Sequence, residues 1–170
     1  MKSKPTGVGV LAAAWVAVWI PFRLCALDAA ELELVSRTVA SARIPEVPAV
    51  IATLVTSASP KDRTETATTA VVTAVRMHPA AMGACVLAAV RAAPDIAEPV
   101  VVAALDAQPG GALALVSVAA EQEDEVGERV IAVTERRFPS RAASFEREIA
   151  VVRTRRFTGV SLPPPTAARP

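Results

Sequence analysis

The chain has 170 residues, a formal net charge of +1, and a composition that is 52% hydrophobic but only 4% aromatic. This length allows one modest domain with a core of its own, and a charge so close to zero argues against nucleic-acid binding through bulk electrostatics. The sequence has no Tyr, no Asn and a single His. A catalytic site would therefore have to rely mainly on Ser, Thr, Asp, Glu and Arg, and the Tyr anchors of tight interfaces are missing.

The first 26 residues have the pattern of an export signal. Lys2 and Lys4 precede an uncharged apolar run over residues 8–20, which Pro21 ends. A basic head followed by an apolar stretch too short for a typical membrane span predicts a secretory signal peptide, with cleavage after Ala26. The alternative is an uncleaved anchor, so we expect a periplasmic or extracellular protein, or one held at the inner membrane by residues 8–20.

Two short helices are predicted before the middle of the chain. The stretch over residues 29–42 has amphipathic spacing, and residues 47–57 form an apolar run in which Pro48 suits the first turn. A polar break follows at residues 59–61.

From residue 64 onward the chain repeats every 15 residues. The repeated starting position is filled by residues that begin helices: Thr64, Pro79, Pro94, Pro109, Asp124 and Pro139. The third, sixth and tenth residues after each start fall on one helical face, and the twelfth is usually charged, as at Arg76 and Asp106. Counting in this way predicts three sets of facing residues: Ala67, Met82, Ala97, Ala112, Gly127 and Ala142; Ala70, Cys85, Val100, Leu115, Val130 and Phe145; and Ala74, Ala89, Ala104, Ala119, Thr134 and Ile149.

Helices of about 11 residues are marginal in isolation and must pack on neighbours. We therefore predict an all-α, alanine-rich domain over residues 29–156, with 15-residue units from about 64 to 153. About seven short helices would form antiparallel pairs with tight turns, as a small solenoid or a multi-helix bundle.

Charge divides this array into two parts. Residues 79–120 contain only four charged side chains and are expected to be central and buried, whereas residues 121–156 are densely charged and expected to be solvated. Pro99 predicts a late start or a kink in its helix. The last helix is predicted from about Pro139 to Arg153, and residues 157–170 are predicted to be a disordered, proline-rich tail.

Neither His78 nor Cys85 is predicted to be a catalytic residue. His78 precedes Pro79 in a turn and has no second His or Cys at ligand spacing, so we expect it to stabilise the end of the preceding helix. Cys85 occupies the repeated apolar position and is interpreted as a small buried hydrophobic residue. Cys25 is not expected to be lipidated, because Arg23 stands where a small side chain is needed.

Three charged or glycine-rich segments are also interpreted as structural. The acids of residues 121–128 lack the spacing of a calcium loop and suit the start of a helix. The arginines from Arg136 to Arg156 are expected to be salt-bridged and offset by Glu135, Glu146 and Glu148. Gly110 and Gly111 lack the Lys and Ser/Thr of a phosphate loop and are expected to allow close helix approach.

These observations predict no catalytic, cofactor-binding or metal-binding residue. We expect an exported, non-enzymatic helical-repeat protein that acts as a structural or protein-interaction module of the bacterial envelope, through a protein partner or self-association and without nucleic acid. The alternative is binding to lipid or another hydrophobic surface through proline-punctuated helices.

Overall fold

The computed structural model describes residues 28–122 and 124–158, which form eight α-helices and no β-strand. The predicted all-α class is confirmed, with one helix more than expected; the predicted signal segment lies outside the described residues. The helices are α1 (Ala29–Ser41), α2 (Val47–Ser57), α3 (Arg63–Met77), α4 (Met82–Ala92), α5 (Ala97–Ala107), α6 (Ala112–Ala120), α7 (Glu125–Arg137) and α8 (Ala142–Thr158).

Each proline of the 15-residue period opens a short 3-10 turn, and an α-helix begins three residues later. These turns are Pro79–Ala81, Pro94–Ile96, Pro109–Gly111 and Pro139–Arg141, and a fifth, Ile44–Glu46, precedes α2. One period is therefore a 3-10 turn followed by an α-helix. Pro99 lies in the first turn of α5, where a missing N–H costs no hydrogen bond. The predicted late start of this helix is wrong, because α5 begins at the same distance from Pro94 as α4 does from Pro79.

The two units without a proline begin in different ways. Asp124 is the N-cap of α7, and its Oδ1 accepts a hydrogen bond of 2.7 Å from the backbone N–H of Gly127. A capping carboxylate therefore replaces the proline, as predicted. Helix α3 begins at Arg63, one residue before the predicted Thr64, after a turn that the Ser59 hydroxyl closes by donating to Asp62.

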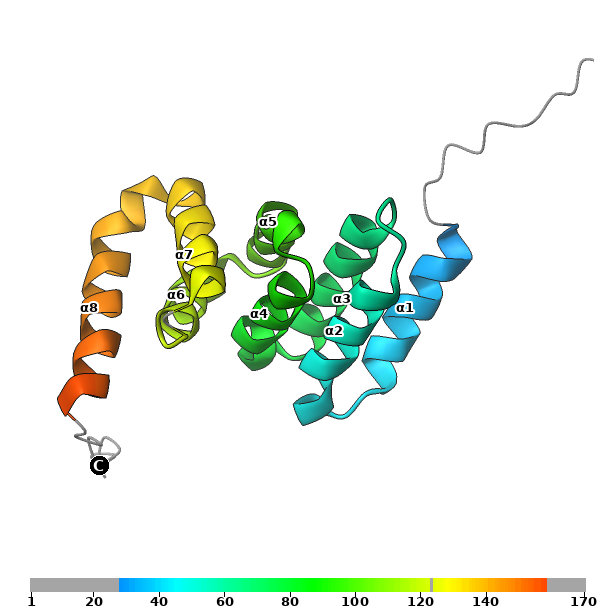
Figure 1. Cartoon of the computed structure of the whole chain (residues 1–170), viewed down its shortest axis with the longest axis horizontal. Helices are drawn as coiled ribbons and strands as arrows, with labels where there is room; N and C mark the ends of the chain where they lie inside the picture. The colour runs from blue at the N-terminus through cyan, green and yellow to red at the C-terminus, as the bar shows by residue number, and fades with distance from the viewer. Residues whose placement is uncertain (1–27, 123, 159–170) are drawn as a thin grey trace, which may run out of the picture.

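The helices form two layers. Helices α1, α3, α5 and α7 pack side by side in chain order, and α2, α4, α6 and α8 do the same, so each helix lies against the second one along the chain (Figure 1). Short turns also bring most chain neighbours together, as for α2 with α3 and α6 with α7. The result is a row of helical pairs.

The core runs between the layers and follows the repeat. The residues of the third, sixth and tenth positions are buried in every unit up to α7, as predicted; in α8 Phe145 is buried, whereas Ala142 and Ile149 are half-buried. The sequence analysis missed the seventh position, which is also buried in five units: Val71, Val86, Val101, Val116 and Ile131. The charge-poor helix α4 has packed neighbours on several sides, in agreement with the prediction, but Ala84, Leu113 and Ala114 of the same stretch are exposed, so the prediction that residues 79–120 are buried is confirmed only in part.

The last helix is longer than predicted. Helix α8 continues to Thr158, five residues beyond Arg153, so the predicted tail is wrong at Phe157 and Thr158. Backbone hydrogen bonding extends the helix through this charged stretch. The rest of the predicted tail, residues 159–170, lies outside the described residues.

Within the described ranges, no single helix is both long and apolar enough to cross a membrane. The segments Pro94–Ala107 and Pro109–Ala120 meet the length and composition criteria only as a pair, and they are bent by 115° relative to each other.

Candidate interaction surface

His78 acts through its backbone at the junction of α3 and α4. Its N–H donates to the carbonyl of Ala74 at 2.8 Å, and its own carbonyl accepts from the N–H of Ala81 at 2.9 Å. It therefore ends α3 and starts the next turn, which agrees with the predicted position at a helix end.

Cys85 is fully buried on the core side of α4. Burial without a compensating charge raises the pKa of its thiol to about 11. A thiol with such a pKa stays protonated at neutral pH and is a poor nucleophile, so the structure supports the interpretation of Cys85 as a core residue.

Three acids at the start of α7 have separate partners. Asp124 caps α7 and also accepts a hydrogen bond from Arg91 at 3.0 Å; the Gly127 N–H and then Arg91 lower the pKa of this carboxyl. Glu125 pairs with Arg129 at 2.6 Å, and Glu128 pairs with Arg153. Among the described residues no group of three or more His, Cys, Asp or Glu side chains could hold a metal ion. Glu123 lies outside the described residues.

Gly111 allows a close approach between turns. A Cβ at this position would lie 2.6 Å from Sδ of Met82, whereas a Cβ on Gly110 would meet nothing within 4 Å. The prediction of close helix approach is thus confirmed at Gly111, and the contact is with the start of α4.

The arginines at the end of α7 are salt-bridged, but their partners differ from those predicted. Arg136 pairs with Glu98 at 3.4 Å and Arg137 with Asp106 at 2.6 Å, so both reach α5, two helices earlier. Glu148, expected to offset these arginines, instead accepts a hydrogen bond from Ser117 of α6 at 2.9 Å. Stacking of every second helix brings residues about two periods apart into contact.

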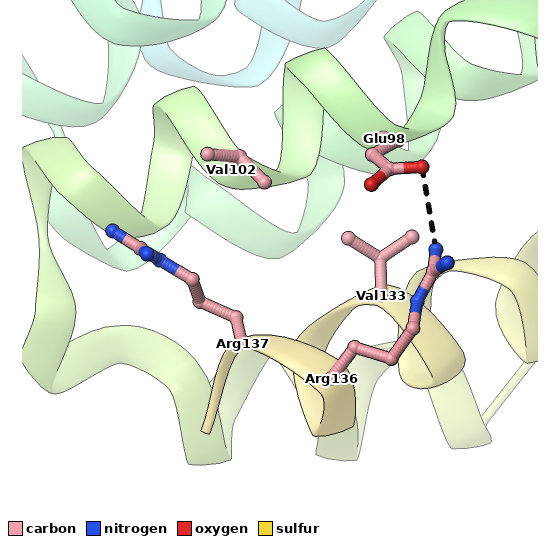
Figure 2. A pocket seen from close by; sticks show the side chains of 5 residues that line it. All are labelled: Glu98, Val102, Val133, Arg136 and Arg137. Atoms are coloured by element: carbon pink, nitrogen blue, oxygen red, sulfur yellow. Dashed lines mark hydrogen bonds and ion pairs between the residues drawn. The ribbon is translucent and has the colours of Figure 1, made fainter. Parts of the chain in front are cut away.

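An open groove lies between α5 and α7, with a volume of about 260 Å³ (Figure 2). Its lining consists of Glu98, Val102, Val133, Arg136 and Arg137. The two valines lie between the arginines, and Figure 2 shows the arginine side chains extending in different directions along the groove. The groove is therefore apolar in its middle and charged at its edges.

Three of the four helices in the even-numbered layer are almost without charge, whereas the last helix of that layer, α8, is densely charged. Helices α2 and α6 contain no charged residue and α4 contains only Arg91, whereas α7 alone contains six charged residues. The exposed uncharged residues of α2, α4 and α6 form what we call the uncharged face: Ala49, Thr53, Thr56, Ser57, Ala84, Leu113 and Ala114. A shallow hollow of about 370 Å³ lies on its α2 part, lined by Ala52, Thr53, Thr56 and Ser57.

The charge-poor stretch over residues 79–120 is visible in the sequence, but its continuation onto α2 was not predicted. The available signal was the equally uncharged α2 segment, which lies more than twenty residues earlier in the chain. Only the packing of α2 beside α4 and of α4 beside α6 joins these segments into one surface.

Comparison of the chain with protein families, with curated proteins and with solved structures gives no match.

Proposed function

We propose that this chain is an exported, non-enzymatic helical-repeat protein, built as a short solenoid, that binds another protein through the uncharged face. The observation that carries the proposal is the near-absence of charge from three neighbouring helices of one layer, α2, α4 and α6. The cores of protein interfaces are depleted of charged residues, because removing an unpaired charge from water is costly. Stacked helical repeats present extended surfaces of this kind.

The polar groups of the uncharged face favour its burial by a partner. The hydroxyls of Thr53 and Thr56 donate to the carbonyls of Ala49 and Ala52, at 2.9 and 2.8 Å, and Ser57 donates to Leu54 at 3.1 Å. Each donor is already satisfied within α2, so a partner can cover the face without leaving a buried donor unpaired. The small side chains also allow a partner helix to approach closely.

The other parts of the proposal rest on separate observations. Export rests on the basic and apolar pattern of residues 1–26. The proposal that the chain is not an enzyme rests on the roles of its reactive groups, because Cys85 is a protonated core residue and Asp124 caps a helix. Lipid binding, the alternative, is less well supported, because cationic residues do not flank the exposed residues of α2 and α6.

The binding proposal is tested by placing a photo-crosslinking amino acid at Ala84 in the full chain, within its native envelope. Ala84 is exposed on α4, and Ala132, exposed on α7 in the other layer, is the matched control position. We expect a discrete adduct with a different protein from position 84, and no adduct with that protein from position 132. Ala84→Glu should abolish capture of that protein by the purified chain, while Ala132→Glu should leave it unchanged.

Equal capture by the two glutamate variants would overturn the assignment of the uncharged face. Flotation with neutral and anionic vesicles tests the alternative of lipid binding. Vesicle binding that Ala84→Glu abolishes would support lipid as the ligand. The mass of the mature chain tests export, because a species beginning after residue 26 is expected from signal cleavage.

A further inference from the structure

The groove between α5 and α7 has an acidic edge and a basic edge. Glu98 and Asp106 lie on α5, and Arg136 and Arg137 lie on α7. Figure 2 shows Glu98 and the two arginines. Their side chains remain substantially exposed, with 67% and 54% of the two acids and 64% and 49% of the two arginines accessible. Since a carboxylate can accept several hydrogen bonds and a guanidinium can donate five, each group keeps capacity for a second partner.

The two helices that carry these edges run in the same direction. Near the start of α7, Arg129 donates to the carbonyl of Pro94 at 2.7 Å, just before the start of α5. Near the end of α7, Arg137 reaches Asp106, near the end of α5. Since the contacts follow the same order along both helices, α5 and α7 are parallel.

An acidic edge and a basic edge that run parallel on one surface are complementary to the same surface of a second copy. Consider a two-fold axis that lies along the groove, parallel to both helices. It would place α5 of one copy over α7 of the other, and each residue would keep its position along the axis. Glu98 of one copy would then face Arg136 of the other, and Asp106 would face Arg137. Such an isologous contact uses the same patch on both partners.

We propose that this face of α5 and α7 binds a second copy of the chain. Val102, half-buried, and Val133, only 4% exposed, would lie at the centre of the contact, with the four ionic groups around them. Opposite charges across an interface set its register and disfavour wrong partners. The contact lies in the odd-numbered layer, so it leaves the uncharged face accessible, and the inference does not depend on the proposed function.

A dimer formed in this way would carry two uncharged faces. A partner that has two binding sites would then be bound with higher avidity than by one copy, because the second contact is intramolecular.

Charge exchange between the edges tests the proposal on the full-length chain. We expect a dimer in sedimentation over the micromolar range, and we expect Arg136→Glu with Arg137→Glu to raise its dissociation constant by about tenfold or more. A second variant adds Glu98→Arg and Asp106→Arg, which exchanges the edges completely and restores the ion pairs within the chain. This variant should dimerise with itself.

The decisive measurement mixes the wild type with the fully exchanged variant. Each edge then meets an edge of the same sign, so mixed dimers should be absent, whereas both homodimers should persist. Exchange of Glu33 and Arg37, an exposed pair on α1, is the matched control and should leave mixed dimers intact. A monomeric wild type, or free mixing of the wild type with the exchanged variant, would overturn the proposal. Neither measurement requires the variant with only Arg136→Glu and Arg137→Glu to fold.

Discussion

Gly127→Ala is a substitution for which the repeat and the tertiary structure make opposite predictions. Four of the six units carry Ala at this third position, so a choice based on the repeat favours Ala. The change should also favour helix formation by about 1 kcal/mol, because Gly loses more backbone entropy in a helix. In the structure, however, a Cβ on Gly127 would lie against the carbonyl oxygen of Ala119, closer than any real Cβ contact.

The obstacle is the backbone of α6, which cannot rotate away as a side chain can. Overpacking of this kind costs about 1–3 kcal/mol, and we take the upper end because α6 and α7 would have to separate. Subtracting the helical gain leaves a net loss of about 2 kcal/mol. For a helical region of this length that corresponds to a melting temperature lower by roughly 6–10 °C.

Urea denaturation followed by far-ultraviolet circular dichroism measures this change. Gly110→Ala is the matched control, since a Cβ there meets nothing within 4 Å, and its stability should differ little from that of the wild type. Hydrogen exchange should place the loss of protection in α6 and α7. A Gly127→Ala protein as stable as the wild type, or more stable, would refute the argument from close packing.

Three further predictions concern other parts of the array. The pKa of Asp124 is lower in the folded chain than in the unfolded chain. The stability that its carboxylate contributes should therefore be present above about pH 3.9 and lost as the pH falls through the pKa of the folded chain. Asp124→Asn keeps a capping oxygen, and the stability of this variant should lack that pH dependence. In a Cys25→Ser background, Cys85 should resist thiol reagents at neutral pH until denaturant is added, and fast labelling of the native protein would contradict its burial. Phe145→Ala should lower the free energy of unfolding by about 3–5 kcal/mol, with Phe145→Leu losing less; an unchanged denaturation midpoint would show that α8 is not anchored by this ring.

Local signals in the chain were sufficient to predict where its helices begin and which residues face inward. The predicted limits of the second helix agree with α2, and the cap at Asp124 was recognised in place of the missing proline. These features depend on backbone donors and side chains within a few residues of one another, so they can be read from spacing alone. The seventh position also lies at helical spacing, four residues after the third and three before the tenth, but only the sixth was assigned to the inward face, so the predicted face was too narrow.

The sequence does not determine the order in which the helices stack, because its 15-residue spacing is equally compatible with a solenoid and with a bundle. The structure places each helix against the second one along the chain, and this choice decides which residues meet across about two periods. It pairs Arg137 with Asp106 instead of a neighbouring acid, and it joins three charge-poor helices into one face. The packing of the chain neighbours α6 and α7 brings Gly127 against the backbone of α6.

The helical period and its inward face therefore follow from interactions within single units, which the sequence displays directly. The uncharged face, the groove between α5 and α7 and the intolerance of Gly127 to a Cβ depend on contacts between units. Those contacts are set by how whole helices pack, because the same 15-residue spacing is compatible with more than one order of packing.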